Sequence, residues 1–326
     1  MESRANIDID PEGAAAYNNL ANEYLSLNRL DDSQSVLDAA KARKLDYSGL
    51  HEALYALAFL REDQEGMQRE ATWAIGKPEE GFMLMLQADT EAFHGRMQKA
   101  RQLWQRGADA AIRNDNKETA ATVKLDEAMF ETAFGDISRA RRLTKEALAL
   151  TSGREASVAA AQALTETGDS KAAEKLVNEL NRDFPTDTII QGSYLPAIRS
   201  QIELRRGNAN KAISLLEQTK PLELGIGLYP AYVRGVAFWR AQQADAAAAE
   251  FQKILSHQGM ILNSRTGPLA RLGLARANAL QTRNAQGAGA AARARAAYRD
   301  FLTLWKDADS DILILKAAKA EYAKLQ

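Results

Sequence analysis

The side chains of this chain that are best suited to bind a ligand are amides, aromatics and methionines. Asn and Gln both donate and accept hydrogen bonds, so they can bond a peptide backbone in either direction. Met and aromatic side chains provide adaptable apolar contact. Helical spacing assigns the following candidate binding residues to one face: Asn18, Asn22, Phe82, Met85, Gln162, Tyr194, Gln201, Tyr232 and Trp239. Phe59, Phe93 and Met129 share this face. The alternative, that the aromatic and Met members belong to the core, stays open.

No catalytic or metal-binding arrangement accompanies these residues. The three histidines, His51, His94 and His257, stand apart without the ligand spacing of a metal site. The chain has no cysteine, which excludes thiol catalysis and thiolate ligands. The sequence also lacks the phosphate-binding and catalytic-loop motifs of phosphoryl transfer. We therefore predict a chain that is not an enzyme and that uses neither a metal nor a cofactor.

Positive charge concentrates toward the C-terminal end of the sequence. The arginines concerned are Arg265, Arg271, Arg276, Arg283, Arg293, Arg295 and Arg299. A nucleic-acid site favours such a patch with aromatics interleaved. Only Tyr298 lies among these arginines, and acidic residues follow them, so we predict no nucleic-acid binding. Two interpretations remain: pairing within the chain on a solvated face, or contact with a phosphate or an acidic partner.

The elements that must position these side chains are pairs of helices. A small residue is followed by a second small residue twelve positions later, and by a larger apolar residue four positions after that. Gly235, Ala247 and Phe251 form one copy of this pattern. The first members of the eight copies are Ala21, Tyr55, Ala88, Ala128, Ala161, Ser200, Gly235 and Gly273. In the last copy an insertion near 282–291 lengthens the spacing.

The small residues of this pattern predict close helix crossings. Helices pack about 8–10 Å apart, and small side chains at the crossing permit the closest approach. Gly in a helix interior costs about 0.5–1 kcal/mol relative to Ala, which close packing can offset. We therefore predict contact between Gly235 and Ala247, and between Gly273 and Ala294. Turn sequences such as TGDSK (167–171) separate the paired helices.

Composition limits the remaining possibilities. The 326 residues carry a net charge of −1, which favours neither polyanion binding nor a membrane surface. No apolar run approaches the roughly 18–20 residues that span a bilayer, so we predict no membrane insertion. The predicted organisation is an N-terminal extension (1–13), a helical solenoid (14–308) and a capping helix (309–326). We expect Asp309 or Ser310 to start the capping helix, with Leu315 and Ala318 on its inner face.

The pattern resembles the tetratricopeptide repeat (TPR), a helix-turn-helix unit of 34 residues. The segments YNNLANEYLSLNRLDDSQSVLDAA (17–40) and YVRGVAFWRAQQADAAAAEFQKIL (232–255) carry the resemblance best. It implies a right-handed superhelical solenoid of about eight hairpins with an extended concave face. A narrower resemblance is to the C-terminal TPR region of bacterial eukaryotic-like serine/threonine protein kinases. It is carried by YNNLANEYLSLNRLDDSQ, LYALAFLREDQEGMQREATWAIGKPE, LYPAYVRG and the tail from AYRDFLTLW onward.

The function expected from these observations is a non-catalytic protein-interaction or scaffolding module. The narrower resemblance implies the sensor or docking region of a kinase-type bacterial signalling protein, with a protein or peptide partner. Such a region would lie outside the cytoplasm if it followed a kinase membrane helix, and inside if it stood alone. Two alternatives remain: a small-molecule or acidic-ligand receptor or enzyme that uses the Arg-rich last repeat, and a self-assembling structural adaptor.

Overall fold

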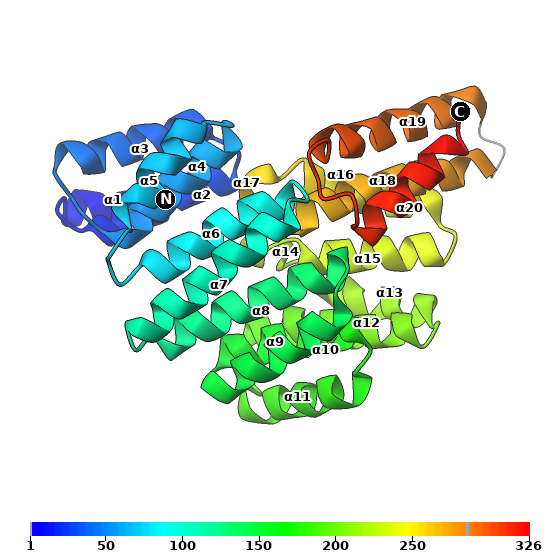
Figure 1. Cartoon of the computed structure of the whole chain (residues 1–326), viewed down its shortest axis with the longest axis horizontal. Coiled ribbons are helices and arrows are strands. Elements are labelled where there is room, and N and C mark those ends of the chain that lie inside the picture. The colour runs from blue at the N-terminus through cyan, green and yellow to red at the C-terminus, as the bar shows by residue number, and fades with distance from the viewer. Residues whose placement is uncertain (1, 284–286) are drawn as a thin grey trace.

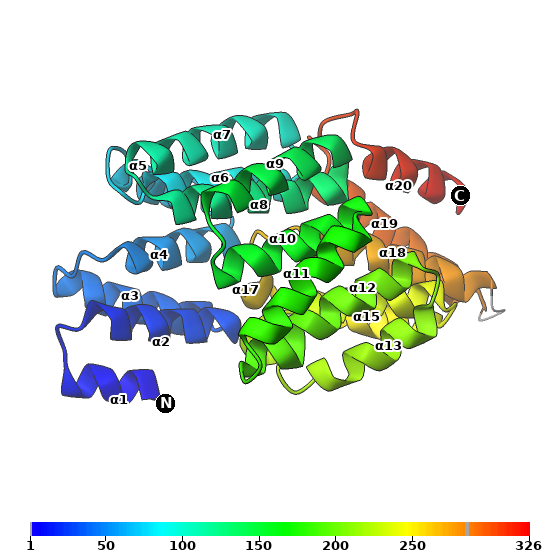
Figure 2. The same ribbon diagram turned by 90° about the horizontal axis from the view of Figure 1, so that it is seen from below.

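The protein is an array of antiparallel helical hairpins that stack side by side (Figures 1 and 2). A computed structural model describes residues 2–283 and 287–326. Within these ranges every regular element is a helix. The eight hairpins are α2 (Ala14–Ser26) with α3 (Leu30–Ala42), α4 (Ser48–Leu60) with α5 (Gln64–Trp73), α6 (Glu80–Phe93) with α7 (Met97–Arg113), α8 (Lys117–Phe134) with α9 (Ile137–Leu150), α10 (Arg154–Thr167) with α11 (Ser170–Asp183), α12 (Leu195–Arg205) with α13 (Ala209–Leu216), α15 (Tyr229–Arg240) with α16 (Ala244–Leu255), and α18 (Thr266–Arg283) with α19 (Gly287–Leu304). The predicted all-α solenoid of about eight hairpins is confirmed.

Shorter helices flank or join the hairpins. They are α1 (Glu2–Ile9), the π-helical turn η1 (Ile190–Tyr194), the 3₁₀ turn η2 (Glu217–Thr219), α14 (Glu223–Ile226), α17 (Gln258–Ile261) and α20 (Leu313–Ala323). Among the described residues, no helix is both long enough and apolar enough to cross a membrane. The insertion predicted near 282–291 includes residues 284–286, which lie outside the described ranges.

The small residues of the sequence pattern lie where paired helices cross. In the first hairpin the Ser33 hydroxyl donates to the carbonyl of Ala21 at 3.0 Å. In the sixth hairpin the serine lies on the first helix instead of the second. The Ser200 hydroxyl donates to the carbonyl of Ala212 on the second helix at 2.9 Å. A side chain reaches the facing backbone in this way only where two helices approach closely. The twelve-residue spacing therefore marks the crossing, as predicted.

The two glycines of the last hairpins accommodate an aromatic ring. A Cβ atom placed on Gly235 would lie 2.9 Å from Phe251 Cε1, and one placed on Gly273 would lie 2.6 Å from the same atom. The three atoms nearest to such a Cβ belong to Phe251 at both glycines, so the ring of Phe251 limits the space there, and the contacts predicted with Ala247 and Ala294 stay predictions. The physical reason for this limit is that α16 packs against both α15 and α18, so its ring fills the space between them.

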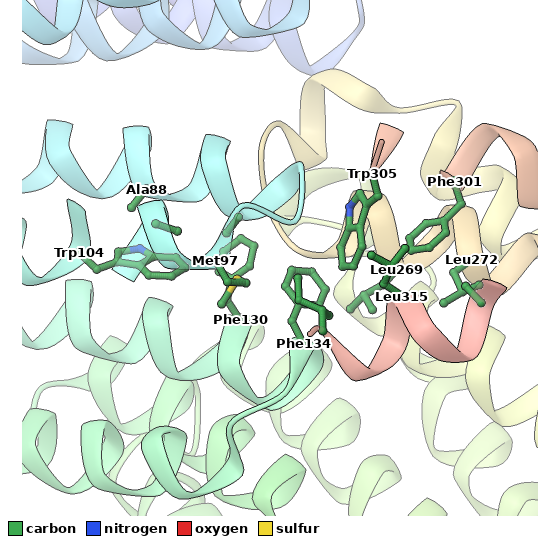
Figure 3. Close-up of a cluster of buried hydrophobic side chains, with 14 of the residues drawn as sticks. Ala88, Met97, Trp104, Phe130, Phe134, Leu269, Leu272, Phe301, Trp305 and Leu315 are labelled. Carbon is green, nitrogen blue, oxygen red and sulfur yellow. The ribbon is translucent and has the colours of Figure 1, made fainter. Parts of the chain in front are cut away.

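The last hairpin docks against the third and fourth hairpins, and this closes the array on itself (Figure 1). Trp305, at the end of α19, donates from its indole nitrogen to the carbonyl of Phe93 at 2.9 Å. Its ring packs edge-on against Phe134 of α8, with centroids 4.9 Å apart (Figure 3). One hydrophobic cluster therefore contains side chains of α6–α8 together with those of α18–α20. The stacked hairpins do not leave one uninterrupted concave groove.

The capping helix takes part in this closure. Leu315 and Ala318 are buried, as predicted. The helix begins at Leu313 rather than at Asp309 or Ser310. Asp309 is engaged elsewhere, because its carboxylate accepts from the backbone N–H of Gln98 at 2.7 Å, in the first turn of α7. An acidic group in a first helical turn satisfies an otherwise unpaired N–H and complements the helix dipole.

A second closing contact joins the first hairpin to the segment before α18. The Asn28 side chain donates to the Ser256 carbonyl at 2.8 Å and accepts from the Gly259 N–H at 2.9 Å. Gly259 fits only because it lacks a side chain, since an added Cβ would lie 1.6 Å from the Leu25 carbonyl oxygen. Two separate N-terminal hairpins are therefore tied to the C-terminal third of the chain.

Candidate functional site

An ion pair between distant segments lies inside the closed array. Arg265, just before α18, donates from Nη1 and Nη2 to the two carboxylate oxygens of Glu166 in α10, at 2.6 and 2.8 Å. Gln201 Nε2 donates to Glu166 at 3.1 Å, and the Tyr229 hydroxyl at 3.0 Å. The Thr132 hydroxyl is a further donor. Four helices or helix ends thus converge on one carboxylate.

The charges of this ion pair are strongly stabilised. Burial alone would raise the pKa of Glu166, but the charge and hydrogen bonds of Arg265 outweigh it and lower that pKa below its ordinary value. Burial raises the pKa of Tyr232 to about 12, and it raises the pKa of Tyr229 as well. At neutral pH the pair is therefore ionised and the tyrosines are neutral. The cluster has the properties of a fixed support rather than of a proton-transfer group.

A cavity of about 450 Å³ opens beside the ion pair, and we call it the central cavity. Its polar lining comes from Thr132, Thr165, Glu166, Gln201, Arg205, Tyr232, Arg240 and Arg265. Its apolar lining comes from Ala133, Leu204, Val233, Val236, Leu269 and Ile314. Three arginines and one glutamate give this lining a formal charge of +2 (3 − 1). Two of the predicted binding residues, Gln201 and Tyr232, belong to it.

The arginines at the rim of the central cavity are held by backbone carbonyls. Arg240 Nη1 donates to the carbonyl of Leu204 at 2.8 Å, and Arg205 Nη2 donates to that of Glu166. Neither forms an ion pair with a carboxylate of the described chain. Burial is the main reason why the pKa of Arg205 is lowered, and the positive charge of Arg240 adds to the effect. The negative charge of Glu166 opposes this shift, but neither rim arginine is within ion-pair distance of a carboxylate among the described residues.

A smaller hollow of about 230 Å³, the side cavity, lies between α6, α8, α10 and the start of α12. It is lined by Met85, Gln162 and Tyr194, three of the predicted binding residues, and by Met129. None of these four residues lines the central cavity. The predicted face is thus divided between two hollows.

Asp126 lines the side cavity and forms an acid pair with Asp89. Burial is the largest cause that raises the pKa of Asp89 well above 3.8, followed by the charge of Asp126. The indole N–H of Trp104 donates to Asp89 at 2.9 Å. Asp126 Oδ2 is buried and has no hydrogen-bond partner among the described residues. We infer that the pair retains one proton, which lets Asp89 donate to Asp126.

The other predicted binding residues lie outside both cavities. Asn18 and Asn22 are on α2, at the end of the array, where Asn22 Nδ2 donates to Asn18 Oδ1 at 2.9 Å. Phe82 packs beside the cluster that closes the array, and Trp239 packs beside the cluster of α15 and α16. The structure therefore does not bring the nine predicted residues together.

The sequence patterns missed Glu166 and the rim arginines Arg205 and Arg240. All three lie near the C-terminal ends of helices, where charged residues are usually solvated, and no local signal distinguishes them. Of the C-terminal arginines, Arg265 pairs with Glu166 and Arg276 pairs with Glu321 at 2.9 Å. Across residues 2–283 and 287–326, no three His, Asp or Glu side chains are grouped so as to hold a metal ion.

Comparison with known proteins shows a likeness in architecture only. No protein-family model and no curated protein sequence matches the chain. Among solved structures, yeast Tom70 is 12% identical with a TM-score of 0.45, over 99% of this chain and 84% of Tom70. The TPR domain of P58(IPK) is 13% identical with a TM-score of 0.30, over 96% and 98% of the two chains. Human IFIT1, in a dimer with m7Gppp-AAAA, is 14% identical with a TM-score of 0.45, over 96% and 76%.

Proposed function

We propose that this chain is a non-catalytic interaction module that binds an acidic peptide segment of a protein partner in the central cavity. The observation that carries the proposal is the +2 lining, in which Arg205 and Arg240 contact backbone carbonyls but no carboxylate. A guanidinium group bonded to a carbonyl keeps donors that can bind a carboxylate.

Peptide chemistry suits the remaining groups of the cavity. Gln201 and Tyr232 add polar side chains to the cavity wall, and such groups can bond a peptide backbone. Leu204, Val236 and Leu269 offer an apolar wall for a neighbouring side chain. An acidic peptide carries all three features, namely a carboxylate, an N–H and apolar surface, whereas a free phosphate offers only the anion. The volume of about 450 Å³ suits a short segment rather than a folded domain.

The test is selection from a library of random short peptides, with and without the rim arginines. We expect the native protein to enrich peptides that contain Asp or Glu. The double variant Arg205→Gln with Arg240→Gln should weaken a selected peptide about tenfold or more, because charge-assisted hydrogen bonds are lost. Arg142→Gln with Arg182→Gln is the matched control, since it removes the same charge from exposed positions on α9 and α11. Selected peptides without acidic residues, or equal loss in both double variants, would contradict the proposal.

The resemblance to the repeat regions of bacterial kinases supports a finer role, that of a docking or sensor region in kinase-type signalling. Four segments of the sequence, including LYPAYVRG, carry that resemblance. The gene that encodes this chain, together with the neighbouring genes, tests the finer role directly. An encoded kinase domain would support it, and neighbours with no connection to signalling would count against it.

A further inference from the structure

A second large hollow, the outer cleft, lies where the two ends of the array meet. Its volume is about 530 Å³. One wall comes from α4, the start of α5 and the end of α6, and the other comes from α17, α18 and α19. Figure 1 shows α17 next to the end of α2, between the N-terminal hairpins and the last ones. The cleft shares no lining residue with the central cavity.

Apolar and aromatic side chains form one part of the lining of the outer cleft. Phe59 and Phe93 meet edge to face with centroids 5.2 Å apart, and His94 packs edge-on against Phe93 at 5.3 Å. The other apolar lining residues are Leu60, Met67, Ile261, Leu262 and Leu304. The other lining residues are polar or charged, so the cleft combines an apolar surface with groups that can orient a small molecule.

Arg271 of α18 is a positive group of the lining that lies close to the aromatic side chains. Its guanidinium carbon lies 5.7 Å from the centroid of the Phe93 ring. It makes no hydrogen bond or ion pair with the described residues, although Asp300 also lines the cleft. Burial lowers the pKa of Arg271, whereas the negative charge of Asp300 opposes the shift. A half-buried guanidinium with unused donors is costly unless another group supplies the acceptors.

His94 adds a hydrogen-bond acceptor. Its Nδ1 donates to the carbonyl of Thr90 at 2.8 Å, which leaves Nε2 as the acceptor of a neutral ring. Burial is the largest cause that lowers the pKa of His94, so the ring is neutral at physiological pH. The other charged lining groups are Glu62, Arg96, Lys306 and Asp307. Of these, Arg96 is paired with Glu91.

We propose that the outer cleft binds a small amphipathic organic anion, with its carboxylate on Arg271 and its apolar body against Phe59, Phe93 and Ile261. Guanidinium binds a carboxylate through two parallel hydrogen bonds, which suits the unused donors of Arg271. The aromatic wall favours an aryl or branched aliphatic body. A hydroxyl or amide N–H of the ligand could donate to His94 Nε2. The carboxyl group of Asp300 disfavours a more highly charged anion such as a phosphate ester.

Such a ligand would also stabilise the closed arrangement of the hairpins. The walls of the cleft belong to the N-terminal hairpins and to the last hairpin, so a bound molecule contacts both. A ligand that binds only the closed arrangement stabilises it by mass action. A ligand in the outer cleft would thereby stabilise the closed arrangement from a site that is separate from the central cavity.

The probe is 4-phenylbutyrate, compared with its neutral amide and with 4-phenylbutylamine, by calorimetry and thermal unfolding at neutral pH. We expect the acid to bind and to raise the unfolding temperature, and the amide to bind about tenfold or more weakly. The amine should not bind. Equal binding of the acid and the amine would overturn the proposal, and so would the absence of binding by the acid.

Four variants locate the site. Arg271→Gln should bind the acid about tenfold or more weakly than the native chain. Asp300→Asn should bind the acid at least as tightly as the native chain. Arg299→Gln, an exposed arginine on α19, is the matched control and should change nothing. Thr303→Trp, at an exposed lining position, should block binding by filling the mouth without removing charge. If Arg271→Gln does not fold, retained binding in Thr303→Trp would refute the site by itself. Peptide binding in the central cavity should persist in all four variants, which separates this proposal from the previous one.

Discussion

At the scale of single residues, the acid pair of Asp89 and Asp126 gives the protein a defined response to pH. The pKa of Asp89 is well above 3.8, its ordinary value, because the carboxyl is buried beside a second carboxyl. At pH values between 3.8 and the raised pKa, Asp89 keeps a proton in the folded chain and loses it in the unfolded chain. The free energy of unfolding therefore falls as pH rises through this window.

Asp89→Asn should remove this pH dependence. The amide oxygen still accepts from Trp104, and the amide N–H still donates to Asp126, so the hydrogen bonds survive without a second buried charge. We expect the free energy of unfolding to rise by on the order of 1 kcal/mol at about pH 8, with little change near pH 4. Urea unfolding at both pH values measures this change in the free energy of unfolding. Asp38→Asn, at an exposed position, is the control. A variant that is less stable than the native chain at both values would contradict this account of the acid pair.

At the scale of helices, the structure depends on how closely one helix approaches the next. Hydroxyl-to-carbonyl bonds at Ser33 and Ser200 fix two of the crossings. At the last two hairpins, Phe251 of α16 fits between the glycines of α15 and α18. A ring placed between two helices makes the packing of neighbouring hairpins interdependent.

Gly273→Ala should destabilise the protein, although Ala is the better helix former. The new methyl group would lie 2.6 Å from the Phe251 ring, so we expect a loss of about 1–3 kcal/mol in the free energy of unfolding. In a Phe251→Leu background the same substitution should cost less, because the ring has gone, and a double-mutant cycle measures that difference.

The control for this prediction is Gly289→Ala on α19. A Cβ atom there would meet only Arg293 Nη1, at 3.6 Å, which is ordinary contact. We expect no loss of stability in this variant. Equal destabilisation by both substitutions would mean that the effect is not one of space at Phe251.

At the scale of the whole molecule, the closure of the array creates both the central cavity and the outer cleft. The C-terminal hairpin reaches the third hairpin through Trp305 and Asp309, and the first hairpin through the segment bonded to Asn28. The hydrophobic cluster in Figure 3 spans this junction. A repeat array gains a long-range interface in this way, beyond the nearest-neighbour contacts that stabilise repeats in general.

Trp305→Ala should weaken this junction selectively. Loss of the buried ring should cost about 3–5 kcal/mol in the free energy of unfolding. We also expect a larger radius of gyration by small-angle X-ray scattering and faster amide exchange in α20. Trp305→Phe keeps most of the packing and should cost only about 1 kcal/mol, through the lost hydrogen bond to Phe93. An unchanged radius of gyration in Trp305→Ala would show that other contacts suffice to hold the array closed.

The sequence by itself determined the hairpins. The spacing of Ala21 and Ser33, or of Ser200 and Ala212, encodes a helix crossing, because two residues twelve apart face each other across a short turn. Turn residues mark the helix ends for the same local reason. Such features depend on a few neighbouring residues, so a single sequence is enough to predict them.

Only the tertiary structure decided where the array closes and which polar groups meet inside it. Arg265 and Glu166 are 99 positions apart, and Trp305 and Phe93 are 212 apart. Their meeting depends on the sum of the small rotations between successive hairpins, which no residue spacing records. Buried charges were missed for a related reason. Arg234 is fully buried and pairs with Glu223 at 2.5 Å. A helical sequence pattern predicts that a charged residue is exposed to solvent, because the pattern does not include its partner on another element.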